Sequence, residues 1–193
     1  DVGDTETGKA ALRYDPLPWL GLRATISNGF HAPTLAQEYY SAVAVSPTTA
    51  RGIIAANSPG ARANGDSALK PERSTNVSGG IVLEPVKRLH ITADVYQINL
   101  RDQILPGGNV YGTDALSALQ MNGFTLPADA ATWGSSLSTH WFANVASTRT
   151  QGLDITATYP TELSPTIGRI DWDVGINLNR TRLHNNGIGL NGQ

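Results

Sequence analysis

The chain alternates apolar and polar side chains over several long segments, and the stretch around which the rest is organised runs from Ser74 to Ile104. Odd-numbered positions from Val77 to Leu83, and again from Leu89 to Val95, are apolar or glycine, whereas the even-numbered positions between them are mostly polar. Successive side chains of a strand point to opposite faces, so this alternation predicts two strands, each with one apolar face. Pro85 marks the turn between them. A change of phase afterwards predicts a β-bulge near Tyr96-Gln97.

Further segments with the same alternation predict strands over residues 9–15, 19–28, 142–159 and 170–178. The connections between strands are alternately short and long, and four aromatic residues lie beside the short ones: Tyr14, Trp19, Tyr159 and Trp172. Short turns at one end, long loops at the other and an aromatic girdle are typical of an outer-membrane β-barrel. The polar faces suit a water-filled or plugged lumen, because a dry core does not tolerate consecutive polar residues.

The long connections contain signals for short helices. Thr34 and Gln37 have capping-box spacing, and Ser46-Pro47 resembles a cap followed by proline at a helix start. Both helices are expected to end by Ser58-Pro59-Gly60, and a third is predicted from Thr113, as its cap, to Asn122. We therefore expect an all-β, antiparallel up-and-down meander with short helices in long external loops. It would form about six strands of a larger transmembrane β-barrel.

Composition narrows the function classes. The chain has 193 residues and a formal net charge of −2, which gives no argument for nucleic acid or for an electrostatic membrane patch. Cysteine is absent, so disulfides, cysteine-bound zinc and thiol nucleophiles are excluded. No apolar run reaches the roughly 18 residues of a transmembrane helix. The first residues, DVGDTETGKA, lack a signal-peptide pattern, so we expect a mature form or a fragment.

Three stretches together are similar to one known family: Leu12–Tyr40, Ala68–Pro85 and Leu89–Ile104. They resemble, in order, the C-terminal half of the barrel of TonB-dependent outer-membrane receptors. The pieces Gly-Phe-His-Ala-Pro and Leu-Lys-Pro-Glu are the most specific, and Ala143–Tyr159 resembles the family's strand with Asn and Gly-x-Glu, with Asp154 where Glu is usual. The resemblance implies a plugged barrel of about 22 strands. It also implies active import of a scarce ligand, such as a siderophore, cobalamin or a saccharide, energised through TonB.

The resemblance covers only part of such a barrel. Residues 1–193 carry no plug domain, no TonB box and no closing strand. Since lipid does not tolerate open sheet edges, we expect the chain to be a portion of a larger protein. The implied partners are the TonB complex (through the missing plug), the rest of the barrel, outer-membrane lipid of a Gram-negative bacterium and a small-molecule ligand. The segment from Ala32 to Ala68 contains no histidine, which argues against haem.

Several residues are candidates for ligand binding. His31 stands where the family usually has arginine, and it either contacts plug or ligand in the lumen or is an ordinary hydrogen-bonding residue there. Other candidates begin or end long loops, where they stack on a ligand or pack on each other: Glu38, Tyr39, Tyr40, His140 and Trp141. Polar-face carboxylates are read as solvated lumen groups rather than metal ligands: Asp94, Asp154, Asp171 and Asp173.

No motif supports catalysis, so we expect neither an enzyme nor a cofactor. The sequence contains no G-x-S-x-G, H-E-x-x-H or P-loop. Gly187–Gly192 matches G-x-G-x-x-G, but no helix can follow it before Gln193. Two other classes remain open. A passive porin or adhesin would lack an upstream plug in the full gene, and a soluble β-sandwich binding module would be monomeric without detergent.

The barrel interpretation predicts that Val174 faces hydrocarbon. Val174→Arg should then make insertion into lipid less favourable by about 2–4 kcal/mol near mid-bilayer. The measurement is folding of the variant into lipid vesicles. Unchanged insertion would show that the assignment of faces is wrong.

Overall fold

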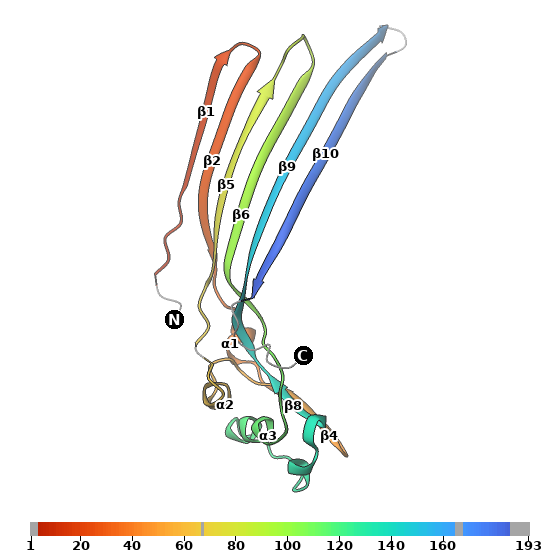
Figure 1. Cartoon of the computed structure of the whole chain (residues 1–193). Coiled ribbons are helices and arrows are strands. Elements are labelled where there is room, and N and C mark those ends of the chain that lie inside the picture. The colour runs from red at the N-terminus through yellow and green to blue at the C-terminus, as the bar shows by residue number, and fades with distance from the viewer. Residues whose placement is uncertain (1–3, 67, 165–167, 186–193) are drawn as a thin grey trace.

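The computed structural model describes residues 4–66, 68–164 and 168–185, and its strands form two sheets. The larger is a six-stranded antiparallel sheet in which long strands that follow one another along the chain lie side by side (Figure 1). This confirms the up-and-down meander. In order across the sheet, the strands are β1 (Lys9–Leu17), β2 (Leu20–His31), β5 (Glu72–Leu83), β6 (His90–Pro106), β9 (Phe142–Ser164) and β10 (Gly168–Asn185).

Short hairpin turns lie at one end of this sheet and both long connections at the other, as the sequence predicts (Figure 1). The first long connection forms α1 (Leu35–Tyr39), β3 (Ala42–Ser46), β4 (Thr49–Ile53) and α2 (Pro59–Ala63). The second forms β7 (Val110–Tyr111), α3 (Gly112–Met121), the 3-10 helices η1 (Ala130–Thr132) and η2 (Gly134–Ser136), and β8 (Leu137–His140). A sheet in the order β3-β4-β8-β7, with α2 and α3, makes a compact unit that we call the loop domain.

Strand register places the apolar side chains on one face, which we call the outer face. One row across the sheet consists of directly paired residues: Leu22, Ile81, Ala93, Ile155 and Ile176. These side chains are not covered, and Val174 and Leu178 are each 60% exposed. The described residues form a single layer here, which contradicts the soluble β-sandwich, since a sandwich needs a second sheet over its apolar face. None of the helices described is long and apolar enough to span a membrane.

The opposite, inner face carries a row of polar side chains at the same height. Arg23 Nε donates to Asp94 Oδ1 at 2.7 Å, and Nη2 donates to the other carboxylate oxygen. The two residues lie on strands separated by β5, where Gly80 pairs with both. A Cβ at Gly80 would collide with the Asp94 carboxylate, so the missing side chain lets the ion pair form across the intervening strand.

The prediction of a β-bulge near Tyr96-Gln97 is wrong. Strands β5 and β6 pair without interruption from Arg73–Arg101 to Leu83–Ile91, so the even-numbered apolar residues of β6 lie on the inner face. The change of phase instead marks where the outer face of β6 stops being apolar. Register between β6 and β9 shifts further along, around Asp102, whose φ of 56° lies in the left-handed region.

Two of the predicted helix boundaries are wrong. Ser46-Pro47 begins the turn of the β3–β4 hairpin rather than a helix, because the alternating residues around it pair as strands. Ser58-Pro59 starts a helix instead of ending one, since Ser58 Oγ accepts from the N–H of Ala61 and proline occupies the first turn. The Thr34 capping box is confirmed, with the N–H of Gln37 donating to Thr34 Oγ1 at 3.2 Å.

The third helix is confirmed, with a different start. It spans Gly112–Met121, and its N-cap is Tyr111 rather than Thr113. Together with β4 and β8 it encloses the main buried cluster of the described chain. The members of this cluster are Ala50, Ile54, Ala61, Ala115, Ala118, Leu119, Leu137, Trp141, Ala143, Val145 and Ala146.

Substitution of Gly80 tests the ion pair. Gly80→Ala should lower the free energy of unfolding of a receptor that carries this chain by about 1–3 kcal/mol, because the new methyl group displaces Asp94 from Arg23. Denaturant titration in detergent measures the effect. The matched control is Gly79→Ala, whose Cβ would lie 3.8 Å from the carbonyl oxygen of Arg23, an ordinary contact. Equal effects of the two substitutions would contradict the assignment.

Candidate functional site

A hollow of about 540 Å³ lies on one face of the loop-domain sheet, at the end of the molecule that holds the long connections. Arg51 of β4 lies opposite Ser138 of β8, and Ser138 is in turn opposite Tyr111 of β7, so the three form a row across the sheet. His140 lies on the same face, two residues along β8. The hollow therefore combines a guanidinium, a phenol ring, an imidazole and a hydroxyl group.

The other face of this sheet is covered. Gly52, which follows Arg51, faces Leu119 of α3, and a Cβ there would lie 2.7 Å from the leucine side chain. Leu137 and Thr139 of β8 are fully buried on the same side. Close packing of helix on sheet fixes β4 and β8, and it leaves Arg51, Ser138 and His140 on the opposite face, where Arg51 is exposed, His140 is partly exposed and Ser138 is only 8% exposed.

Arg51 is exposed and has no ion-pair partner among the described residues. An exposed guanidinium in a hollow suits a planar anion, since it offers paired N–H donors in a fixed geometry. Tyr111 adds an aromatic surface at the edge of the same row. The arrangement is suited to binding an anionic, partly aromatic small molecule.

The structure separates two candidates that are adjacent in sequence. His140 lines the hollow that contains Arg51. Trp141 is 8% exposed, belongs to the buried cluster and lines a different hollow, of about 230 Å³, beside Gly107 and Val145. Trp141 lies between the end of β8 and the start of β9, and of the two side chains only His140 lies beside Arg51.

The candidates in the first loop lie away from Arg51. Glu38 and Tyr39 belong to α1, Tyr40 is its C-cap, and none of the three lines the hollow. Both tyrosines are more than half exposed, at 59% and 56%. In Figure 1, α1 lies between the six-stranded sheet and the rest of the loop domain.

His31 lies at the inner rim of the sheet. Its Nδ1 is 3.6 Å from Oε2 of Glu72, the directly paired residue on β5. The other carboxylate oxygen, Glu72 Oε1, accepts from the N–H of Ile104 at 2.7 Å. Ile104 is where the β6–β9 register shifts, so Glu72 satisfies a backbone donor at the bulge.

Asn144 secures the same junction from β9. Its side-chain Nδ2 donates to the carbonyl oxygens of Asp102 (2.6 Å) and Lys70 (2.9 Å), and its Oδ1 accepts from the N–H of Lys70 at 2.8 Å. The segment before β5 is thereby attached to the bulge in β6. Asn144 and Glu72 together position the loop domain on the sheet.

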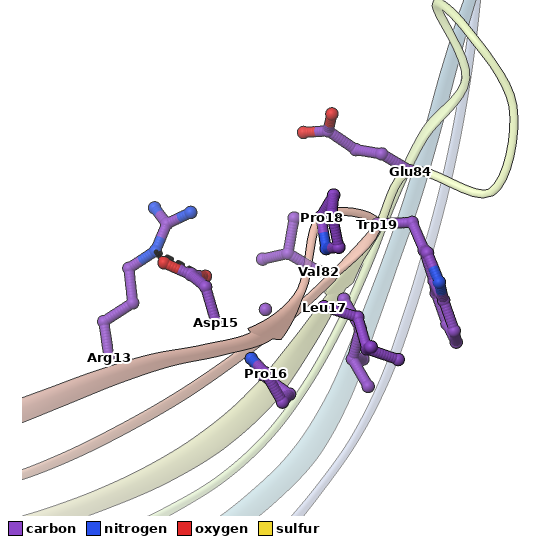
Figure 2. A pocket seen from close by; sticks show the side chains of 10 residues that line it. Arg13, Asp15, Pro16, Leu17, Pro18, Trp19, Val82 and Glu84 are labelled. Carbon is purple, nitrogen blue, oxygen red and sulfur yellow. Dashed lines mark hydrogen bonds and ion pairs between the residues drawn. The ribbon is translucent and has the colours of Figure 1, made fainter.

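A further hollow lies at the opposite end of the sheet, around the β1–β2 turn (Figure 2). Figure 2 shows Arg13 and Asp15 on one side of the chain and Leu17 and Trp19 on the other. Arg13 Nε is 3.1 Å from both carboxylate oxygens of Asp15. Polar groups on the inner side and an aromatic on the outer side fit an interfacial turn better than a ligand site. In the described chain, no three His, Asp or Glu residues gather as metal ligands.

Comparison with known proteins decides the family. The family model described as "TonB dependent receptor-like, beta-barrel" matches residues 1–192. The chain belongs to the TonB-dependent receptor β-barrel family. This family consists of transport receptors of the Gram-negative outer membrane rather than enzymes. A comparison with curated proteins finds no significant match.

Solved structures of siderophore receptors share the fold of this receptor barrel segment. A variant of the ferric enterobactin receptor PfeA from Pseudomonas aeruginosa matches with a TM-score of 0.60 and 18% identity, over 91% of this chain and 22% of that one. A PfeA variant in complex with enterobactin gives 0.58 and 18%, over the same shares. The siderophore receptor PirA from Acinetobacter baumannii gives 0.50 and 16%, over 79% and 20%. The chain thus spans about a fifth of the length of these receptors.

Sequence reasoning missed Arg51, Ser138 and Tyr111 as members of the receptor's loop hollow. A signal for Arg51 was present, because Thr49, Arg51 and Ile53 alternate with small or apolar residues that turn out to be buried or to face the helices. Its reading as part of a helix obscured that alternation. The meeting of Arg51 with Ser138 depends on parallel pairing of β4 with β8, which no local pattern reports.

Asn144→Ala should lower the free energy of unfolding of the receptor by about 1–3 kcal/mol, because backbone groups of Lys70 and Asp102 lose their partner. It should also speed amide hydrogen exchange in residues 68–70. Asn179→Ala is the matched control, since that amide donates only to Asn177 in the part of the chain described here. Protection of the amides of residues 68–70 that is unchanged by Asn144→Ala would refute the role given to this side chain.

Proposed function

We propose that this chain is a barrel segment of an active-transport receptor that imports a ferric siderophore across the outer membrane, energised through TonB. The observation that carries the proposal is Arg51, an exposed guanidinium in a hollow of the external loop domain. The iron-binding groups of siderophores are anionic oxygens, and a guanidinium is the side chain best matched to such groups.

The neighbours of Arg51 support the same ligand class. Tyr111 gives an aromatic surface for stacking, and His140 and Ser138 supply hydrogen-bonding groups. PfeA has been solved in complex with enterobactin, and PirA is a siderophore receptor. Cobalamin and saccharides remain the alternative ligands. A neutral saccharide has no negative charge for Arg51 to bind.

The inner face supports a filled lumen rather than an open pore. Arg23 and Asp94 are joined across Gly80, and Asn177 donates to Asp154, so these charges are held close to the sheet. We infer that a plug domain packs over this row in the complete receptor and that TonB acts on the plug. A passive porin or adhesin is the second candidate function.

Arg51→Ala should weaken binding of a ferric catecholate siderophore to the complete receptor about tenfold or more, because a charge-assisted hydrogen bond is lost. Fluorescence or calorimetric titration of the purified receptor measures this, and growth under iron limitation reports import. Arg51→Lys should retain part of the affinity. Arg62→Ala is the matched control, since Arg62 is exposed on α2 and does not line the hollow.

Unchanged affinity in Arg51→Ala would show that the hollow is not the ligand site. Import in a strain without TonB separates the two functions. Without TonB, an active receptor stops importing, whereas a passive porin continues to import. Continued import in that strain would refute the proposal.

A further inference from the structure

The apolar outer face ends at a defined level on the side of the long loops. Along β10 the last apolar residue of the outer row is Leu178, paired with Leu153 of β9, which is paired in turn with Val95 of β6. No charged side chain lies among the outer-face residues of β10 from Ile170 to Leu178. Beyond this level the outer face of β10, β9 and β6 becomes polar, with Arg180, Gln151 and Gln97 in the next row, whereas Val77 and Ile26 continue the apolar face on β5 and β2.

Arginines occupy the outer face just past this level. Arg180 is paired with Gln151, and Arg182 is paired with Arg149. All three arginines are exposed. We call Arg149, Arg180 and Arg182 the arginine strip.

A polar network holds Arg149 of the strip against the sheet. Arg149 Nε donates to Asn99 Oδ1 at 2.9 Å, and Asn99 also accepts from Gln97 at 3.4 Å. Gln151 donates to Gln97 at 2.7 Å. These bonds fix the base of the Arg149 guanidinium on the outer surface.

The strip has no anionic partner in the described chain. None of its arginines has a carboxylate within ion-pair distance in residues 4–66, 68–164 and 168–185. Like charges directly opposite each other on a sheet are destabilising, yet Arg149 faces Arg182. A bound anion between the two would remove this repulsion. The described sheet has two other opposed arginine pairs. Arg13 and Arg23 each have a carboxylate partner, Asp15 and Asp94, and Arg73 and Arg101 share a hollow with Asp4 and Glu6.

The height of the strip matches a lipid headgroup layer. Arg180 and Arg182 follow Leu178 by two and four residues, which is about 7 and 14 Å along a strand. With a barrel tilt of about 40°, these distances become about 5 and 10 Å along the membrane normal. The headgroup layer is about 5–8 Å thick on each side of the hydrocarbon. Arg180 therefore lies within the layer, and Arg182 and its partner Arg149 lie just past its outer edge, within reach of an extended arginine side chain. Long loops are external, so this is the outer leaflet.

We propose that the arginine strip binds phosphate groups of the anionic glycolipid of the outer leaflet. The proposal rests on the membrane placement given under the proposed function and concerns a surface separate from the Arg51 hollow. Arginine binds phosphate through paired N–H donors, and opposed guanidiniums can hold one phosphate between them.

The test compares retention of diphosphorylated lipid A by the complete receptor and by the double variant Arg149→Gln/Arg182→Gln. Receptors are purified in detergent, incubated with lipid A micelles and examined by native mass spectrometry. We expect the double variant to bind about tenfold more weakly, because charge-assisted hydrogen bonds are lost. Binding to the original receptor should weaken as salt is added.

Controls separate this surface from other effects. Arg149→Lys/Arg182→Lys keeps the charge and should bind more tightly than the glutamine variant. Arg88 lies at the short-turn end of the sheet, where its Nη2 is 2.9 Å from Oε1 of Glu162. Arg88→Gln should therefore not change lipid A binding. Siderophore binding at the Arg51 hollow should be intact in the double glutamine variant, which shows that the receptor is folded and keeps the two proposals independent.

Three outcomes would overturn the proposal. The first is equal lipid A binding by the original receptor and the double glutamine variant. The second is inorganic phosphate binding as tightly as lipid A, which would make this a free-anion site. The third is a change in oligomeric state of the double variant without a change in lipid A binding, which would assign the strip to contact between receptor copies.

Discussion

Lateral hydrogen bonding between neighbouring strands is the constraint on which this structure depends. A chain in hydrocarbon has no water to satisfy its N–H and C=O groups, so each strand must satisfy them through its neighbours. Strands β9 and β10 pair from Ser164–Gly168 to Ala146–Asn185 with one irregularity, at Gly168/Arg169. Regular pairing imposes a side-chain period of two, and the sequence must then place apolar groups on one side and polar groups on the other. Charges can therefore exist at mid-sheet only on the inner face, as Arg23 and Asp94 do.

The same constraint explains the side chains at the junction with the loop domain. The ladder between β6 and β9 becomes irregular at Asp102, which leaves backbone groups without strand partners. Glu72 accepts from the N–H of Ile104, and Asn144 donates to the carbonyl of Asp102. Both residues belong to segments that resemble family motifs. The structure thus gives a physical reason for a glutamate and an asparagine at these positions, namely satisfaction of backbone groups that the strands no longer pair.

The long strands could be predicted from the sequence because their faces meet two different environments, and alternation records this directly. The loop domain could not, because identical dipeptides have different outcomes there. Ser46-Pro47 lies at a hairpin turn, whereas Ser58-Pro59 starts a helix. Proline fixes its own φ in both cases, so the neighbours decide between them. The choice at β4 depends on pairing with β8, which lies far along the chain. The hollow around Arg51 arises from that pairing. Sequence reasoning placed His140 among the candidates but missed Arg51, because no local pattern reports the pairing.

Net charge was the least informative quantity, and the structure shows why. A formal charge of −2 gave no sign of an electrostatic membrane patch, yet groups of opposite charge lie on different faces of the sheet. Asp94 and Asp154 lie on the inner face, while Arg149, Arg180 and Arg182 lie on the outer face beyond the apolar residues. A sum over the chain cancels groups that never meet, because one set faces the lumen and the other faces the surroundings. For a single-layer sheet, charge has to be summed separately for each face and for each level along the strands. The alternation that predicts the strands already assigns each side chain to a face.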